Sequence, residues 1–179
     1  MSSPAAAFLS NAAPRLAALD AALAQVESPA EVAWTLCEYA GTELALVDAI
    51  VYLLDPGGRT LTQHAAWGPK RAASRVLESR ITLAIGQGIV GRCAQLRLPQ
   101  RTGDARLDAR YVADDQFNLS ELAVPILFDD TLSGVLDSEH PDADYYALEH
   151  EHALAAIAER GARRLASLAI RSGRDPVPG

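Results

Sequence analysis

The chain has 179 residues, 49% hydrophobic and 22% charged, an ordinary composition for a single globular domain of this length. Its formal net charge of −7 disfavours a nucleic-acid partner, because Lys and Arg neutralising phosphates dominate such binding. No run reaches the ~18 apolar residues of a membrane helix and no export signal is evident, so we expect a cytoplasmic protein that does not engage a membrane.

We expect residues 1–13 to be a flexible end and residues 14–171 to form one domain that begins with a helix. Four residues at a/d heptad spacing give this first helix a narrow apolar stripe: Leu16, Leu19, Leu23 and Val26. A short isolated helix is marginal in water, so the stripe needs a packing partner. We expect a homodimer held by the terminal helices. The alternative is that the stripe folds back onto its own domain.

A second helix should begin at Ser28-Pro29-Ala30-Glu31, which is a capping box with proline at the first helical position, and should end near Gly41. Two apolar runs then follow over residues 48–54 and 60–67. They are joined by Asp55-Pro56-Gly57-Gly58, a strong turn signal, so a β-hairpin is predicted.

The next motif, Gly86-Gln87-Gly88-Ile89-Val90-Gly91, has the G-x-G-x-x-G spacing of a dinucleotide-binding turn. That function needs a βαβ unit with an acid about 20 residues on. Here the nearest acids, Asp104 and Asp108, come too early, and a polar run stands where the second strand should be. We therefore predict a structural turn from a strand over residues 81–85 into a short helix over residues 89–96.

The last third of the chain predicts a hairpin and a long helix. Residues 123–128 and 132–139 pair through Asp129-Asp130, and Pro125 indicates an edge strand or a bulge. A helix over residues 145–170 is predicted from apolar residues at 3.6-residue spacing, with acids at its start and arginines toward its end. The breaker-rich residues 172–179 should be a disordered tail.

Several of these segments, taken in order, resemble the GAF domain, a PAS-like sensory fold, over about residues 28–168. They are the glycine-rich turn, Asp104, Asp108-Ala109-Arg110-Tyr111, Ser120-Glu121-Leu122-Ala123-Val124-Pro125-Ile126, the Asp129-Asp130 turn, and Leu132-Ser133-Gly134-Val135-Leu136-Asp137-Ser138-Glu139. The resemblance implies an α+β fold in which helices flank an antiparallel sheet and the N- and C-terminal helices pack together on one face. It also implies a role in signal transduction, with a ligand cavity under residues 68–80 and 101–119.

Seven residues lie in or face those segments and form the candidate ligand site: Trp67, Tyr111, Asp115, Phe117, Glu121, Asp137 and Glu139. Strand alternation puts Asp137 and Glu139 on one face, and Glu121 belongs to the neighbouring hairpin strand. Three carboxylates beside aromatic rings would suit a ligand with an amine or guanidinium group. The alternatives are that the acids face water or pair with a loop arginine, and that Trp67 and Phe117 belong to the core.

Enzymatic function is the main competing class. Free methionine-(R)-sulfoxide reductases are single-domain GAF proteins, and the acids Glu121, Asp137 and Glu139 are similar to the set that holds their substrate amine. Those enzymes place cysteines where this chain has Val90 and in the 111–119 loop, which contains none. Without a resolving partner, Cys93 cannot easily complete a disulfide cycle.

We therefore expect no catalysis and no cofactor, and we interpret Cys37 and Cys93 as core thiols. Neither the cysteines nor the four histidines have zinc-ligand spacing. The signatures of cyclic-nucleotide and bilin-binding GAF domains are also missing. The predicted function is that of a sensor that binds a small molecule or a downstream signalling protein, and a GAF dimerisation module without a ligand is a further alternative.

Overall fold

The protein is described by a computed structural model that covers residues 3–68, 71–72, 75–77, 80–104 and 118–172. Its helices are α1 (Pro4–Ser10), α2 (Ala12–Ala24), α3 (Pro29–Glu43), α4 (Gly88–Leu96) and α5 (Leu148–Arg171). Its strands are β1 (Ala49–Leu54), β2 (Thr60–Trp67), β3 (Arg71–Ala72), β4 (Val76–Leu77), β5 (Thr82–Ala84), β6 (Gln100–Thr102), β7 (Ser120–Phe128) and β8 (Thr131–His140). The predicted α+β class is confirmed.

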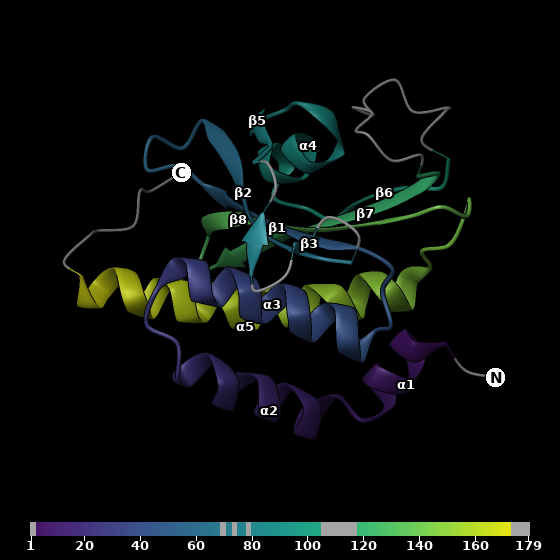
Figure 1. Ribbon diagram of the computed structural model, residues 1–179, viewed down its shortest axis with the longest axis horizontal. Helices are drawn as coiled ribbons and strands as arrows, with labels where there is room; N and C mark the ends of the chain where they lie inside the picture. Colours follow the sequence, from purple (N-terminus) through teal and green to yellow (C-terminus); the bar gives the residue numbers. More distant parts are fainter. Residues whose placement is uncertain (1–2, 69–70, 73–74, 78–79, 105–117, 173–179) are drawn as a thin grey trace.

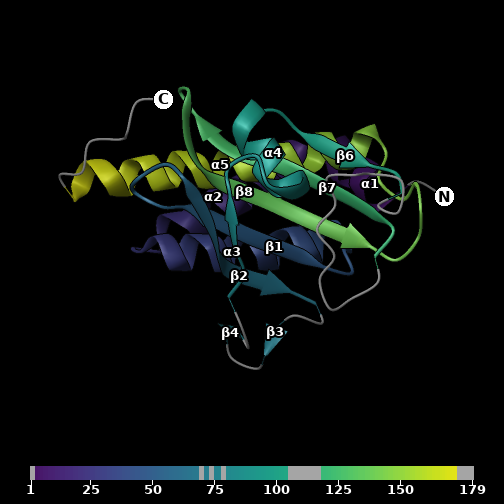
Figure 2. The same cartoon turned by 90° about the horizontal axis from the view of Figure 1, so that it is seen from above.

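The molecule is layered around one antiparallel sheet with strand order β5-β2-β1-β8-β7-β6. Helices α3 and α5 cover one face, and α1 and α2 lie outside them (Figure 1). The short helix α4 covers part of the other face, and β3 and β4 form a small separate ribbon beyond β2 (Figure 2). Each face of the sheet has its own hydrophobic core.

Both predicted hairpins are present. The β1–β2 turn is closed by the Asp55 carboxylate, which accepts backbone N–H groups of Gly57, Arg59 and Thr60 at 3.0, 2.8 and 2.6 Å. These bonds lower the pKa of Asp55 to about 2. The β7–β8 turn is made by Asp129 and Asp130, both with positive φ, as a two-residue hairpin loop requires.

Pro125 is tolerated in β7 because β6 pairs only with residues 121–123 of that strand. The proline lies beyond the end of β6, where no ladder partner needs its missing N–H. It is therefore near an edge, as the sequence indicated.

The glycine-rich turn connects β5 to α4 and its backbone groups bond to one another. Gly86 N–H donates to Gly91 O at 2.8 Å, and Gly91 N–H donates to Gln87 O at 2.9 Å. A Cβ at Gly91 would lie only 2.5 Å from Ala84 O, so this glycine lets the helix approach the strand. The spacing thus serves packing of α4 on the sheet.

The N-terminal residues differ from expectation, because residues 4–10 form α1 instead of a flexible end. Ser3 caps the helix by accepting Ala6 N–H at 3.1 Å, and Phe8 is fully buried in the core cluster that also contains α5 residues. The predicted tail over residues 172–179 lies, apart from Ser172, outside the described residues.

The apolar stripe packs within its own chain, with Leu16 and Val26 partly buried, which corrects the expected dimer interface. Leu19 and Leu23 are 0% and 2% exposed and belong to the core cluster beneath the sheet. Arg160 of α5 pairs with Asp20 at 3.3 Å, and Arg164 Nε donates to Val26 O at 3.2 Å. The terminal helices therefore pack together within the chain, and the centre of the stripe, Leu19 and Leu23, is not available to a second copy.

The capping box of α3 is as predicted, with the Glu31 side chain accepting Ser28 N–H at 3.0 Å. Helix α3 ends at Glu43, two residues beyond the predicted end, and α5 begins at Leu148, three residues after the predicted start. No helix in the described parts of the chain is long and apolar enough to cross a membrane.

Candidate functional site

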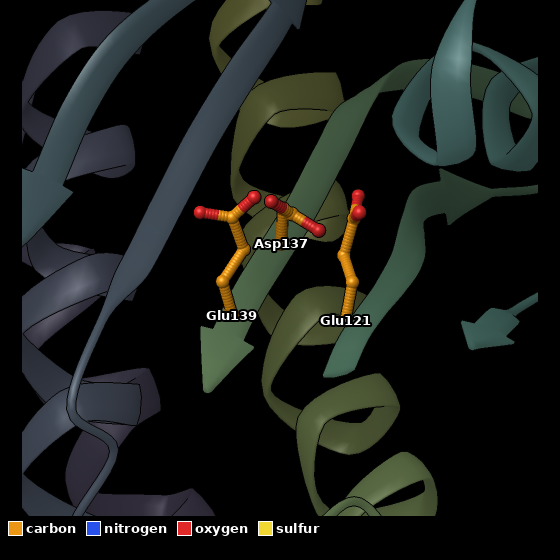
Figure 3. A group of neighbouring side chains, drawn as sticks. All are labelled: Glu121, Asp137 and Glu139. Carbon is orange, nitrogen blue, oxygen red and sulfur yellow. The ribbon is translucent and has the colours of Figure 1, made fainter. Parts of the chain in front are cut away.

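Three buried carboxylates converge on two adjacent central strands (Figure 3). Glu121 lies on β7 and pairs directly with Glu139 of β8, while Asp137 stands two residues before Glu139 on the same face. One carboxylate oxygen from each side chain lies within 4.8 Å of the others. The side chains are 5%, 2% and 6% exposed in the order Glu121, Asp137, Glu139. Asp137 and Glu139 thus share a face, as strand alternation predicted, and the observed register adds Glu121.

The carboxylates face the α4 side of the sheet. The register aligns Asp137 with Ile50 of β1 and Ala123 of β7, and both belong to the core between the sheet and α4. Their strand neighbours Leu122 and Leu136 point the other way, into the core beneath α3 and α5. Alternation therefore turns each acid away from the helical layer.

Tyr52 and Asn118 surround the acids, and neither adds negative charge to the site. Tyr52 of β1 lies on the same face, and burial followed by the charges of Asp137, Glu139 and Glu121 raises the pKa of its phenol well above the usual value. Asn118 Nδ2 donates to Glu139 Oε2 at 2.9 Å, which fixes that carboxylate in place. A cation entering this group would meet several acceptors in a poorly hydrated environment.

Oxygen donors in this arrangement could hold either an ammonium or guanidinium group or a hard metal ion. Carboxylates bind both kinds of cation, and a buried acidic group does not by itself select a metal. Asn118 contributes an N–H donor to Glu139, and donors of this kind orient a carboxylate toward a ligand.

The structure brings only some of the predicted residues together. Tyr111, Asp115 and Phe117 lie outside the described residues. Trp67 lies on the opposite face of the sheet, where its Nε1–H donates to Leu46 O at 3.1 Å and its ring packs against Gly41 of α3. Trp67 is therefore part of the helix-side core, as the alternative interpretation held.

Two residues at this site were not identified from the sequence. Tyr52 could have been, because strand alternation places it two residues after Ile50 on a hydrophobic hairpin strand. Asn118 gave no usable signal, because its contact with Glu139 depends on how the chain enters β7. Both are nearly buried, and both face or contact the carboxylates.

The two thiols lie on opposite faces of the sheet and cannot meet. Cys93 of α4 belongs to the core on the carboxylate side, whereas Cys37 of α3 belongs to the helix-side core, where its Sγ donates to Ala49 O at 3.6 Å. Both are free and fully buried. Burial, then the charges of Asp137 and Glu121, raises the pKa of Cys93, so the nucleophilic thiolate is disfavoured.

Comparison with known proteins is consistent with this architecture. The family model described as "GAF domain" matches residues 26–166. No relative was found among curated protein sequences. The GAF domain of a phosphoenolpyruvate-protein phosphotransferase from Coxiella burnetii superposes with a TM-score of 0.74 at 18% identity, covering 89% of this chain and 95% of that one.

Two further solved structures are similar. A protein described as a GAF sensor from Burkholderia vietnamiensis superposes with a TM-score of 0.72 at 23% identity, covering 88% of this chain and 95% of that one. Free methionine-R-sulfoxide reductase from Neisseria meningitidis, solved with its substrate, gives a TM-score of 0.72 at 18% identity, covering 88% and 89%. At these identities the similarity shows the fold alone, and the neighbours include a GAF sensor as well as an enzyme.

Proposed function

Because the chain belongs to the GAF domain family, we propose that it is a non-enzymatic sensory domain that binds a small molecule carrying an amine or guanidinium group. The observation that carries this proposal is the convergence of Glu121, Asp137 and Glu139 in a nearly buried position on the α4 face. In a poorly hydrated position, carboxylates hold a cationic group through charge-assisted hydrogen bonds. The ligand's cationic group is held by these three carboxylates.

Occupancy is passed on through β8 and α5. Strand β8 carries two of the three acids, and only residues 141–147 separate its end from the start of α5. Helix α5 packs against β7, β8, α1, α2 and α3, so it touches most of the helical layer. A shift of β8 on binding would therefore reach α5 and the N-terminal helices.

The reductase is the second candidate, favoured by the superposition on that enzyme and by the set of acids. The thiols argue against it. By the resemblance to those enzymes, Val90 stands where they have a catalytic cysteine. Cys93 is buried with a raised pKa, and Cys37 lies across the sheet. A GAF dimerisation module without ligand loses support because the α2 stripe is buried within the chain.

Native mass spectrometry of freshly purified protein tests the proposal. We expect the 19.0 kDa chain to carry a small-molecule adduct, or to acquire one from a panel of primary amines and guanidines. The adduct should be lost in Glu121→Gln/Asp137→Asn. The matched control is Asp130→Asn/Glu159→Gln, which removes two exposed charges far from the site. Equal binding by both double variants would assign the buried acids a structural role.

A further inference from the structure

The N-terminus of α5 is capped in an unusual way. Its N-cap residue, Ala147, has an extended backbone and no side-chain oxygen. The capping contact is made instead by His150, at the third helical position, whose Nδ1 accepts the Ala147 N–H at 3.1 Å. The ring is 5% exposed, so water has little access to replace this bond.

Helix α3 provides a comparison within the same chain. There Glu31, also at the third helical position, accepts the Ser28 N–H at 3.0 Å. The hydrogen bonds to Ser28 and Glu27 lower the pKa of Glu31, so this carboxylate remains an acceptor throughout the neutral and mildly acidic range. Helices α3 and α5 therefore use the same capping position with acceptors that titrate in different ranges.

An imidazole Nδ1 that accepts a hydrogen bond carries no proton, so the neutral ring of His150 must hold its proton on Nε2. Protonation fills Nδ1, which removes the acceptor, and it adds a positive charge at the positive end of the helix dipole. We propose that His150 is an acid-sensitive cap that releases the first turn of α5 in mildly acidic solution. This inference is independent of the ligand site.

Groups from several elements face His150. Aromatic rings from the segment before α5 surround it, with Tyr145 tilted at a centroid distance of 5.2 Å and Tyr146 edge-on at 5.9 Å. His140, at the end of β8, stacks on Tyr145 at 3.6 Å. The charged and titratable groups near the ring are Glu149 of α5, Arg101 of β6, His140 of β8 and, beside His140, Asp142.

These groups favour the neutral ring overall. Burial lowers the pKa of His150 most, Arg101 and His140 lower it further, and Glu149 opposes them. Helix α1 contributes no titratable side chain here, but Ser3 next to it donates to Glu149 Oε1 at 3.5 Å. Loosening the first turn of α5 would therefore also loosen the contact with the N-terminus.

The direction of the pH effect follows from these signs. The folded state binds the His150 proton less tightly than the unfolded chain, whose histidine pKa is about 6.5. The stabilising contribution of the cap is therefore complete above about pH 6.5 and is lost as the pH falls below that value. The cap of α3 does not change over the same interval.

Amide hydrogen exchange read by NMR tests the cap directly. After correction for intrinsic rates, we expect protection at Ala147 and Glu151 to fall on the order of fivefold between about pH 7.5 and pH 5.5, the loss of one helix cap. The equivalent amides of α3, Ser28 and Val32, should stay constant. His150→Gln keeps a neutral acceptor and should abolish the pH dependence, whereas His64→Gln, at a half-buried histidine of β2 that caps no helix, should retain it.

An unchanged pH dependence in His150→Gln would overturn the proposal, as would constant protection in the wild-type protein. If that variant fails to fold, the protonation of the two ring nitrogens of wild-type His150, followed by NMR, decides the question. A proton on Nε2 at about pH 7.5, with titration that follows the loss of protection at Ala147, supports the cap. A proton on Nδ1 at that pH contradicts it.

Discussion

Gly41→Ala should destabilise the protein even though alanine is the better helix former. Gly41 lies inside α3, where the substitution alone would gain about 1 kcal/mol of helix propensity. The new Cβ, however, would lie 2.4 Å from Cγ and Cδ1 of Trp67. That indole is held by the Nε1–H bond to Leu46 O, so it cannot withdraw without losing about 1 kcal/mol more. With overpacking at about 1–3 kcal/mol, we expect a net loss of about 1–3 kcal/mol.

Urea unfolding followed by circular dichroism measures this loss, and a double-mutant cycle isolates its cause. In a Trp67→Leu background the large ring is gone, so Gly41→Ala should be neutral or stabilising by up to about 1 kcal/mol. The same penalty in both backgrounds would refute the packing of Trp67 on α3. It would also reopen the possibility that this side chain faces the ligand.

Three further predictions concern the helical layer and the thiols. Leu19→Ala should lower the free energy of unfolding by about 2–5 kcal/mol without changing the molar mass in light scattering, because Leu19 is fully buried in its own chain. A fall in molar mass with stability intact would restore the α2 stripe as an interface. Cys37 and Cys93 should resist a thiol reagent until the protein unfolds, because both are fully buried and burial raises the pKa of each. For the same reason, the protein should not reduce free methionine sulfoxide when a dithiol is supplied. Turnover that Cys93→Ser abolishes would overturn the prediction that the protein does not reduce methionine sulfoxide.

The elements that could be predicted from the sequence are those with strong local signals. The capping box at Ser28 and the turn at residues 55–58 fix a helix start and a hairpin through neighbouring residues, and both are where they were expected. The convergence of Glu121, Asp137 and Glu139 was predictable only in part, because alternation along β8 places Asp137 and Glu139 on one face but does not place Glu121. Strict pairing from the two-residue turn would put Glu121 opposite Ser138, on the other face, and the register shift between Ile126 and Leu127 brings it opposite Glu139 instead.

The features that were missed depend on contacts between distant parts of the chain. Helix α1 is stabilised by the burial of Phe8 in a core shared with α5, which no local pattern reveals. Leu61 and Gln63 of β2 lie on the α4 face of the sheet, so strict alternation along β2 would put Trp67 on that face, beside the carboxylates. A register shift between Val51 and Tyr52 reverses the faces, so Trp67 turns toward α3.

Calorimetric titration tests the central claim most directly, that the three buried carboxylates hold a cationic group. The probes are primary amines and guanidines, each paired with its N-acylated, uncharged counterpart. We expect binding of a charged member and not of its counterpart, weakened by about 1–3 kcal/mol in Glu121→Gln/Asp137→Asn and unchanged in Asp130→Asn/Glu159→Gln. Equal affinity for charged and acylated probes, or unchanged affinity in the folded Glu121→Gln/Asp137→Asn protein, would contradict the account.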